Sequence, residues 1–311
     1  MLGLSLGNHP TALFAAPLVA LSLGRRPRRW LLAGVGAALG LAIYAYLPLR
    51  AAAGPPLNWG NPRDLERFWW VVSGAPYRSF IFALPQGYLP GRLLAWAGLL
   101  ARQLGVAGLP LAALGAATLW RSDRACLVAT AATATASSAF AIGYNTTDSH
   151  LYLIPALLCL AAWLGVGASW LLTALAARSR QLGRAAAGLL ILLPLATALP
   201  RFPQMSLRGD RVASDFGILT LGQAPHRAVI LSEQDRHTFA LWYFQHAHSL
   251  RSDVVVVDPG LLGYDWYREQ VAAQLAAPWP AEAGAAQAAH ELGRPVCHIT
   301  SEESNLFCIE P

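Results

Sequence analysis

Long apolar runs separated by short arginine-rich gaps constrain this chain more than any other feature of its sequence. A helix of about 20 apolar residues is long enough to cross a membrane. The runs lie at about residues 11–23, 30–49, 93–120, 125–144, 151–177 and 185–200. Hydrophobic residues make up 55% of the chain and charged residues 13%, as is typical of a polytopic membrane protein. We therefore expect about six α-helical spans.

The arginine-rich gaps predict which side of the membrane each loop occupies. Residues 24–29, 121–124 and 178–184 hold nine arginines between them, and six spans would place these gaps on one face. Positive residues concentrate on the cytoplasmic side, so both termini are expected outside the cytoplasm. The net charge of +6 is interpreted as a topology signal rather than as a nucleic-acid-binding surface.

After about residue 201 the sequence changes to short apolar stretches that alternate with amphipathic ones. This alternation predicts a small α/β domain with parallel strands. The expected strands and helices are, in order, 228–233, 235–248, 253–258 and 264–275. The second of these segments is a helix that should turn Phe239, Trp242 and Tyr243 inward, and residues 278–289 are expected to form a surface excursion.

The expected domain organisation follows from this change of character. Residues 1–201 form a transmembrane region with an outer interfacial loop at 50–92, and residues 202–311 form an extracytoplasmic α/β domain. Within that domain, Cys297 and Cys308 are candidates for a disulfide, which is reasonable outside the cytoplasm. A zinc site that uses His298 lacks a second metal-spaced pair, so no metal site is assigned.

The stretch from Tyr46 to Arg78 begins where the second apolar run ends. Asn61 as N-cap and Pro62 at the first position predict a helix start, and Gly74 predicts its end. The apolar face of this helix consists of Leu65, Phe68, Trp69 and Val72. A Trp-rich amphipathic helix beside a span is typical of one that lies in the lipid interface. A plain anchor without chemistry is the alternative.

Several outer-face residues have the chemistry to bind a lipid-linked phosphate and a sugar. Arginine and histidine bind phosphate through charge-assisted hydrogen bonds, aromatic rings stack on sugar faces, and amides bond hydroxyls. The set is Asn8, His9, Arg50, Asn58, Trp59, Asn61, Tyr77, Arg78, Asp148 and His150. Arg50 closes a span at headgroup depth and is expected to bind the phosphate, or simply to anchor the helix. Asp148 is a candidate base, and its alternative is a helix cap. Asn8 and His9 likewise have a capping alternative.

Four blocks of the sequence together resemble one polytopic family. The blocks are GLSLGNHPTALFAAP, YLPLRAAAGPPLNWGNPRDLERFWWVVSGAPYR, YNTTDSHLYLIPA and VILSEQDRHTFALWYFQHAHSLRSDVVVVDPGLLGYDWY. They resemble, in this order, the family of transmembrane protein 260-like protein O-mannosyltransferases and their bacterial relatives. The resemblance implies a GT-C-type glycosyltransferase that takes a sugar, mannose-like, from a polyprenyl-phosphate donor and passes it to a protein or glycan acceptor. It also implies that Asn8, His9, Arg50, Asn58, Trp59, Trp70, Tyr77, Arg78 and Asp148 occupy motif positions.

The chain departs from this family at its start. The relatives begin with further spans and an acidic outer loop where the base is expected, and this chain begins after them. We therefore expect either a truncated gene or a partner subunit, and the catalytic residues stay unassigned. Expected partners are the bilayer, the lipid-linked sugar and the acceptor, with no nucleic acid. No cofactor is expected in the chain, and its Ala-, Leu- and Arg-rich composition indicates a bacterial inner membrane.

Two other classes of protein stay open. A transporter or lipid-flipping subunit would also combine spans with an outer domain, but it should carry ionisable residues in the middle of its spans, where this chain has almost none. A structural or assembly protein would use the outer domain to bind partners.

Overall fold

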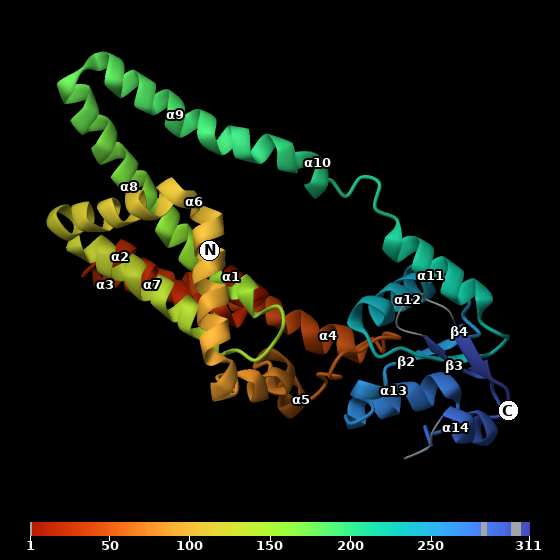
Figure 1. Cartoon of the computed structure of the whole chain (residues 1–311). Coiled ribbons are helices and arrows are strands. Elements are labelled where there is room, and N and C mark those ends of the chain that lie inside the picture. The colour runs from red at the N-terminus through yellow and green to blue at the C-terminus, as the bar shows by residue number, and fades with distance from the viewer. Residues whose placement is uncertain (1, 281–284, 300–305) are drawn as a thin grey trace. The chain divides into compact units, whose positions relative to one another are not determined.

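The chain divides into two compact units in the computed structural model, which describes residues 2–280, 285–299 and 306–311 (Figure 1). Unit 1 consists of Met1–Tyr46 and Val72–Gln204, and unit 2 consists of Leu47–Val71 and Met205–Pro311. Unit 1 is helical, whereas unit 2 combines helices with a sheet. The segment 47–71 therefore packs with the C-terminal residues, although unit 1 flanks it in the sequence.

The helices of unit 1 follow one another through short turns and 3-10 segments. They are α1 (Leu2–Asn8), α2 (Ala16–Leu23), α3 (Pro27–Leu41), α6 (Leu89–Ser122), α7 (Arg124–Gly143), α8 (Ile154–Arg178), α9 (Arg180–Ala198) and α10 (Phe202–Met205). The 3-10 segments are η1 (Pro10–Ala15), η2 (Ala42–Ala45), η3 (Ala75–Phe80), η4 (Gln86–Tyr88), η5 (Ser149–Leu153) and η6 (Leu199–Arg201). Helix α4 (Tyr46–Ala52) crosses the boundary between the two units.

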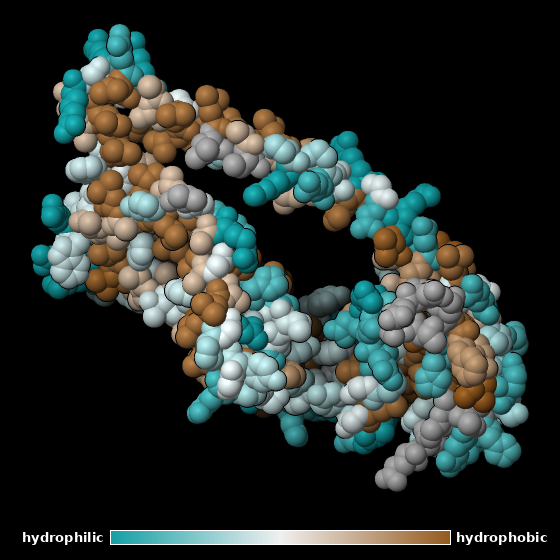
Figure 2. All heavy atoms as spheres, in the orientation of Figure 1, coloured by the Kyte–Doolittle hydropathy of each residue, from teal (hydrophilic) through white to brown (hydrophobic). Residues whose placement is uncertain are grey.

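Four helical segments among the described residues are long and apolar enough to cross a membrane. They are Pro27–Ala52, Arg124–Gly143, Ser149–Arg178 and Arg180–Met205. Hydrophobic residues cover much of α8 and α9 in Figure 2, as lipid contact requires. These helices make the chain a membrane-associated protein.

A fifth span exists if the bent helix α6 is counted as one. Its two arms, Gln86–Gly105 and Ala107–Ser122, meet at 92°. Gly105 has φ 71° and ψ 174°, a conformation that favours glycine, and Pro110 lacks the N–H that would bond the carbonyl four residues earlier. The sequence predicted one span at residues 93–120, and the bend divides that run between two arms.

Six spans are not confirmed, because the first apolar run does not form a membrane-length helix. Helix α1 ends at Asn8, and Pro10 begins a new segment, which leaves Pro10–Leu23 as a shorter apolar helix. Proline cannot continue the hydrogen-bond ladder of the preceding turn. The break at residues 8–10 therefore separates the apolar helix α1 from the run at 11–23, and the two do not form one long helix.

Glycines allow α6 and α8 to approach closely in unit 1. A Cβ atom on Gly115 would lie 1.7 Å from the carbonyl oxygen of Trp163, and one on Gly167 would lie 2.0 Å from that of Leu111. Small residues at helix contacts are a common packing device in membranes. The indole of Trp163 also donates to Thr130 Oγ1 across 2.8 Å, which ties α8 to α7.

Unit 2 is built around a mixed sheet. Its helices are α5 (Leu65–Val72), α11 (Val212–Gln223), α12 (Asp235–Ala247), α13 (Asp265–Leu275) and α14 (Ala285–Leu292), with η7 at Pro259–Leu261. Its strands are β1 (Val229–Leu231), β2 (Val255–Val257), β3 (Val296–Ile299) and β4 (Leu306–Ile309). The order is β2-β1-β3-β4, in which β1 runs parallel to β2 and β3, and β4 is antiparallel to β3.

The predicted parallel pair and its two helices are confirmed, but the inward face of α12 is not as predicted. Trp242 is buried against the sheet and donates its indole N–H to the carbonyl of Val256. Phe239 and Tyr243 are 51% and 56% exposed. They lie beside the buried stripe of Thr238, Leu241, Trp242 and Gln245, because residues three and four apart share a face. Helix α14 covers part of the segment expected to be a surface excursion.

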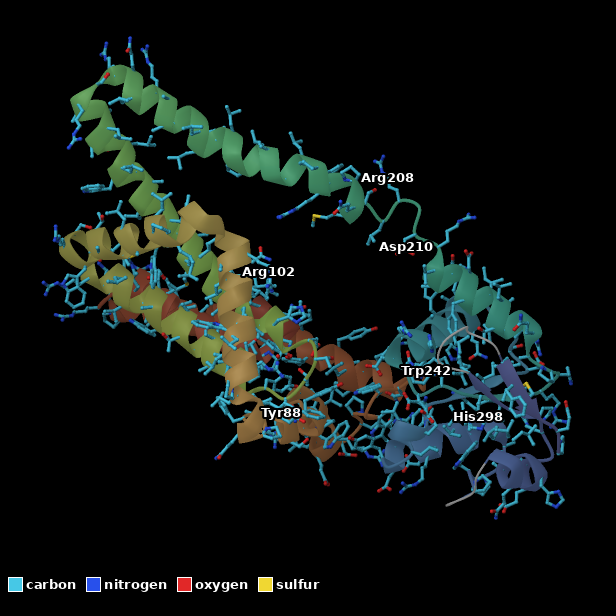
Figure 3. The ribbon with its side chains drawn as sticks, in the orientation of Figure 1. Tyr88, Arg102, Arg208, Asp210, Trp242 and His298 are labelled. Carbon is cyan, nitrogen blue, oxygen red and sulfur yellow. A yellow bond between two sulfur atoms is a disulfide. The ribbon has the colours of Figure 1, made fainter. Side chains whose placement is uncertain are left out.

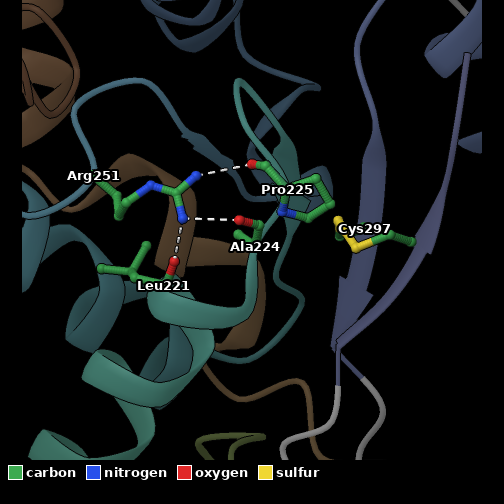
Figure 4. The surroundings of a disulfide bond; sticks show 6 residues. Leu221, Ala224, Pro225, Arg251 and Cys297 are labelled. Carbon is green, nitrogen blue, oxygen red and sulfur yellow. Dashed lines mark hydrogen bonds between the residues drawn. A yellow bond between two sulfur atoms is a disulfide. The ribbon is translucent and has the colours of Figure 1, made fainter.

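Arg251 fixes the end of α11 in unit 2 (Figure 4). Its guanidinium donates to the carbonyls of Leu221, Ala224 and Pro225 at 2.8–2.9 Å. It also donates to both carboxylate oxygens of Asp253, at 2.8 and 2.9 Å. The last carbonyls of a helix lack partners within the helix, so one planar side chain satisfies several of them. The hydrogen bond from Arg251 holds the pKa of Asp253 well below its usual range.

We expect Arg251→Lys to lower the stability of unit 2 by about 2 kcal/mol, because an ammonium group cannot reproduce the fork. A lowered pKa means that Asp253 stabilises the folded state above the unfolded pKa of about 4, and that this contribution is lost as the pH falls below it. Urea unfolding, followed by tryptophan fluorescence at pH 7 and pH 3, measures both effects. Arg268→Lys alters a more exposed pair with Asp265 and serves as the control. Equal losses in the two variants would contradict this role.

Cys297 and Cys308 face each other on β3 and β4 and form a disulfide. We expect both thiols to resist alkylation in denaturant until a reductant is added, whereas Cys126 and Cys159, which are free, react at once. Mass spectrometry of the C-terminal peptide counts the labels. Replacing both bridged cysteines by alanine should lower the free energy of unfolding by about 2–3 kcal/mol, because the bridge closes a short loop. Labelling of the C-terminal peptide before reduction would contradict the bridge.

Candidate functional site

Each unit contains a pocket with convergent polar side chains. The arginine pocket of unit 1 has a volume of about 700 Å³, and the amide pocket of unit 2 has a volume of about 430 Å³. Both volumes lie in the range of small-molecule sites. The residues that line the two pockets differ in charge and in polarity.

The first arm of α6 forms one wall of the arginine pocket. Arg92, Trp96, Leu99 and Arg102 recur at helical spacing and so lie on one face of the helix. Tyr88 and Arg102 mark the two ends of this arm in Figure 3. The remaining lining comes from residues 84 and 85, η4 and the same arm of α6, the end of α7, the turn that follows it and η5. These residues are Leu84, Pro85, Tyr88, Gly91, Ala95, Ala141, Ile142, Asn145, Thr146, Thr147, Ser149, His150 and Leu153.

The charge of the arginine pocket is positive. None of the described residues that line it is acidic, whereas Arg92, Arg102 and His150 all line it. Arg92 donates to the carbonyl of Thr146 and to Ser149 Oγ, and so fixes the turn. The indole N–H of Trp96 and the hydroxyl of Thr146 are buried without a hydrogen-bond partner in the described structure. These two atoms have almost no accessible surface, so the guanidinium groups are the donors that the pocket offers to an anion beside its apolar wall.

An aromatic cluster gathers three of the predicted site residues in unit 1. The ring of His9 lies 5.5 Å from that of Tyr152, which in turn lies 5.3 Å from Tyr144. Burial raises the pKa of Tyr144, and the carboxylate of Asp148 raises it further. His9 is therefore in ring contact with this pair of phenols, and Tyr77 and Asp148 lie near Tyr144.

The capping alternatives have different outcomes at His9 and Asp148. His9 is the N-cap of η1, and its Nδ1 accepts a hydrogen bond from the N–H of Thr11. Asp148 precedes η5, yet its carboxylate makes no capping hydrogen bond to that segment. Asn8 is the exposed last residue of α1, and Arg78 is exposed in η3. Asp148, Asn8 and Arg78 do not line the arginine pocket, so their proposed roles stay predictions.

Trp59 and Trp70 dock the segment 47–71 onto α13 in unit 2. Trp59 lies 5.4 Å from Trp266, and Trp70 lies 5.3 Å from Tyr264, between ring centroids. Gly60 has φ 70°, and a Cβ atom there would lie 2.3 Å from Val71 Cγ2. The Asn-Trp-Gly motif therefore has a packing role, and the assignment of Trp59 and Trp70 to substrate binding stays a prediction.

Helix α5 begins later than predicted. Its first residue is Leu65, and Asp64 Oδ1 accepts from the N–H of Arg67. Asn61, the predicted N-cap, instead has φ 41°, a left-handed conformation that asparagine tolerates. Its side chain accepts a hydrogen bond from Asn58 Nδ2. The turn at residues 58–61 therefore precedes the helix rather than capping it.

The two faces of α5 have different surroundings. Arg67 donates to both carboxylate oxygens of Glu269 at 3.2 and 3.0 Å, and this bond lowers the pKa of Glu269. Leu65 and Trp69, on the predicted apolar face, are 81% and 62% exposed. An exposed apolar face next to a membrane-length helix suits contact with a lipid interface.

The amide pocket lies between α13 and the segment 54–63. Its lining consists of Gly54, Pro55, Pro56, Asn58, Asn61, Arg63, Trp266, Glu269, Gln270, Ala273 and Gln274. The N–H of Asn58 donates to Gln270 Oε1 across 2.9 Å, and Gln274 Nε2 donates to the carbonyl of Pro56 across 3.1 Å. Arg50 lies in the last turn of α4, is exposed and lines neither pocket.

Three residues that line the arginine pocket, Arg92, Trp96 and Arg102, were not among the predicted site residues. The signal was present, because an arginine recurs ten residues after another on one face of an otherwise apolar helix. Within the described residues, no three His, Cys, Asp or Glu side chains converge as a metal site would require.

The comparisons with known proteins give one match. Residues 213–294 match the family model named TMEM260-associated domain 2. A search of curated proteins and a search of solved structures found no match. The matched region covers less than half of the chain and includes α11 to α14 with β1 and β2. The match supports a relation to TMEM260-like proteins.

Proposed function

We propose that this chain is a membrane glycosyltransferase of the GT-C type, or the C-terminal part of one, that uses a polyprenyl-phosphate sugar donor. The arginine pocket carries this proposal. Its arginines suit a phosphate, and its apolar wall suits the first isoprene units of a lipid. The match to TMEM260-associated domain 2 supports the same class.

The proposal assigns distinct tasks to the residues at the pocket. Arg92 is already held by the turn at Thr146 and Ser149, so its charge is pre-positioned. Arg102, ten residues further along the same arm, provides a second cation. Asp148 is the proposed base, because its neighbours in the turn, Thr147 and Ser149, both line the pocket. The acceptor is a protein or a glycan, and the sugar is mannose-like.

The proposed topology has five spans, with the bent α6 counted as one of them. In this arrangement the gaps 24–29, 121–124 and 178–184 lie on one face, because two spans separate each gap from the next. If α6 did not cross, the first gap would lie opposite the second. The positive-inside rule therefore favours five spans. The turn at residues 145–150 and unit 2 then lie outside the cytoplasm, in a bacterial inner membrane. The ring of His9 contacts Tyr152 next to that turn, so the shorter helix Pro10–Leu23 is proposed to lead from the outer face to the first gap, and the N-terminus is also proposed to lie outside.

Arg102→Lys tests the donor site. We expect a ten- to hundred-fold weaker binding of polyprenyl-phosphate mannose, because lysine cannot make the bidentate contact. Native mass spectrometry of the purified chain in detergent measures the bound lipid. Arg121→Lys, on the same helix but outside the pocket, is the control, and Arg50→Lys tests the predicted role of Arg50 in parallel. Arg67 is unsuitable as a control because it pairs with Glu269.

Two results decide between the classes. Unchanged affinity in Arg102→Lys would contradict the donor site. Binding that depends on Arg102 without any sugar transfer in native membranes would favour a lipid-flipping subunit instead.

Reporter fusions test the topology. We expect a fusion after Ser122 to report the cytoplasm and a fusion after Asp210 to report the outer side, because three spans separate the two sites. An alkaline phosphatase and a fluorescent protein, which are active on opposite sides, give complementary readouts. Finding both sites on the same side would overturn the five-span arrangement.

A further inference from the structure

We propose that the amide pocket of unit 2 binds a neutral, hydroxyl-rich saccharide. This inference concerns a second site, in the other unit, and it does not depend on the donor lipid. The pocket lies between one face of α13 and the turn that follows Pro55 and Pro56. Trp266, Gln270 and Gln274 follow each other at four-residue spacing, so they form one row along the helix.

The polar groups of the pocket are partly engaged and partly available. The oxygen of Gln270 accepts from Asn58, the nitrogen of Gln274 donates to Pro56, and the oxygen of Asn61 accepts from Asn58. In the described structure the other polar atoms of these three amides have no hydrogen-bond partner. These atoms are Gln270 Nε2, Asn61 Nδ2 and Gln274 Oε1. Two donors and one acceptor therefore remain, and they are held in place by the bonds that their own amides already make.

The indole of Trp266 forms part of the pocket wall. Trp266 is 7% exposed, and its Nε1–H has almost no accessible surface. The ring therefore offers a ligand an apolar contact, and the hydrogen bonds come from the amides.

The charge of the pocket selects a neutral ligand. Arg63 and Glu269 are the charged residues among its described lining, and their charges cancel. An anion gains little here, in contrast to the arginine pocket. A hydroxyl group both donates and accepts, so a ring of hydroxyls matches a mixed set of amide donors and acceptors.

The same features argue against a peptide as the occupant. Extended peptides commonly add to the exposed edge of a sheet, but a helix and a turn form this pocket. Proline-rich peptides need exposed aromatic ridges, whereas Trp266 is buried. A compact saccharide needs neither of these surfaces.

Saturation-transfer NMR on the whole chain, in a detergent without a sugar headgroup, tests the site. The probes are methyl α-D-mannopyranoside and methyl α-D-glucopyranoside, with methyl glucuronoside and a tetra-alanine amide for comparison. Two variants remove pocket groups in different ways. Gln270→Met replaces the amide by an apolar side chain of nearly the same shape. Asn61→Gly removes a second amide at a position where glycine tolerates the φ angle. Gln234→Met makes the same glutamine-to-methionine change outside the pocket and is the control.

We expect at least one neutral methyl glycoside to bind, and each pocket variant to weaken its affinity about tenfold, as the loss of one or two hydrogen bonds predicts. Gln234→Met should bind like the wild type, and the melting temperatures report that every variant is folded. Absence of binding by both neutral probes would overturn the proposal, as would affinities that do not change in the pocket variants. Preferential binding of the tetra-alanine amide would show that the occupant of the pocket is a peptide and not a saccharide. Because no donor lipid is present, a failure here leaves the donor site untouched.

Discussion

The packing of Trp59, Gly60 and Trp70 against α13 is the contact on which the organisation of unit 2 depends. It holds a segment from early in the chain against residues that follow some 200 positions later. Aromatic side chains bury large areas when they pack, and the absence of a side chain at residue 60 lets Val71 and Trp70 approach. The Arg67–Glu269 pair and two amide bonds then fix the register of the segment along the helix. One wall of the amide pocket exists only because of this docking.

The bend in α6 has a comparable importance for unit 1. It separates an arm that carries Arg92, Trp96 and Arg102 from an arm that packs tightly on α8 through Gly115 and Gly167. The tightly packed arm has no room for a ligand, and the other arm faces the turn at 145–150 across a pocket. A cation in an apolar helix is costly unless a partner or water solvates it. The pocket, rather than lipid, accommodates these arginines.

The two pockets differ in the chemistry that they can recognise. The arginine pocket combines positive charge with an apolar wall and suits an amphiphile with an anionic headgroup. The amide pocket is neutral and polar, and it suits a ligand rich in hydroxyls. A protein that transfers a sugar from a lipid carrier needs to recognise both kinds of group. Each pocket is defined within its own unit, so the two assignments can be tested separately.

The sequence by itself determined the membrane class, the parallel strand pair and the helices that flank it, because apolar length and periodicity are local properties. It also predicted that polar and aromatic residues after the second span form a functional region. It did not determine the number of spans, because the break at residues 8–10 and the bend at Gly105 depend on how short apolar pieces pack. It placed Phe239 and Tyr243 inside, since three neighbouring aromatic residues do not reveal which stripe of a helix meets the sheet. Only the tertiary structure decided that Trp59 and Trp70 dock on α13 and that Arg92 and Arg102 share a pocket, because these contacts join residues far apart in the chain.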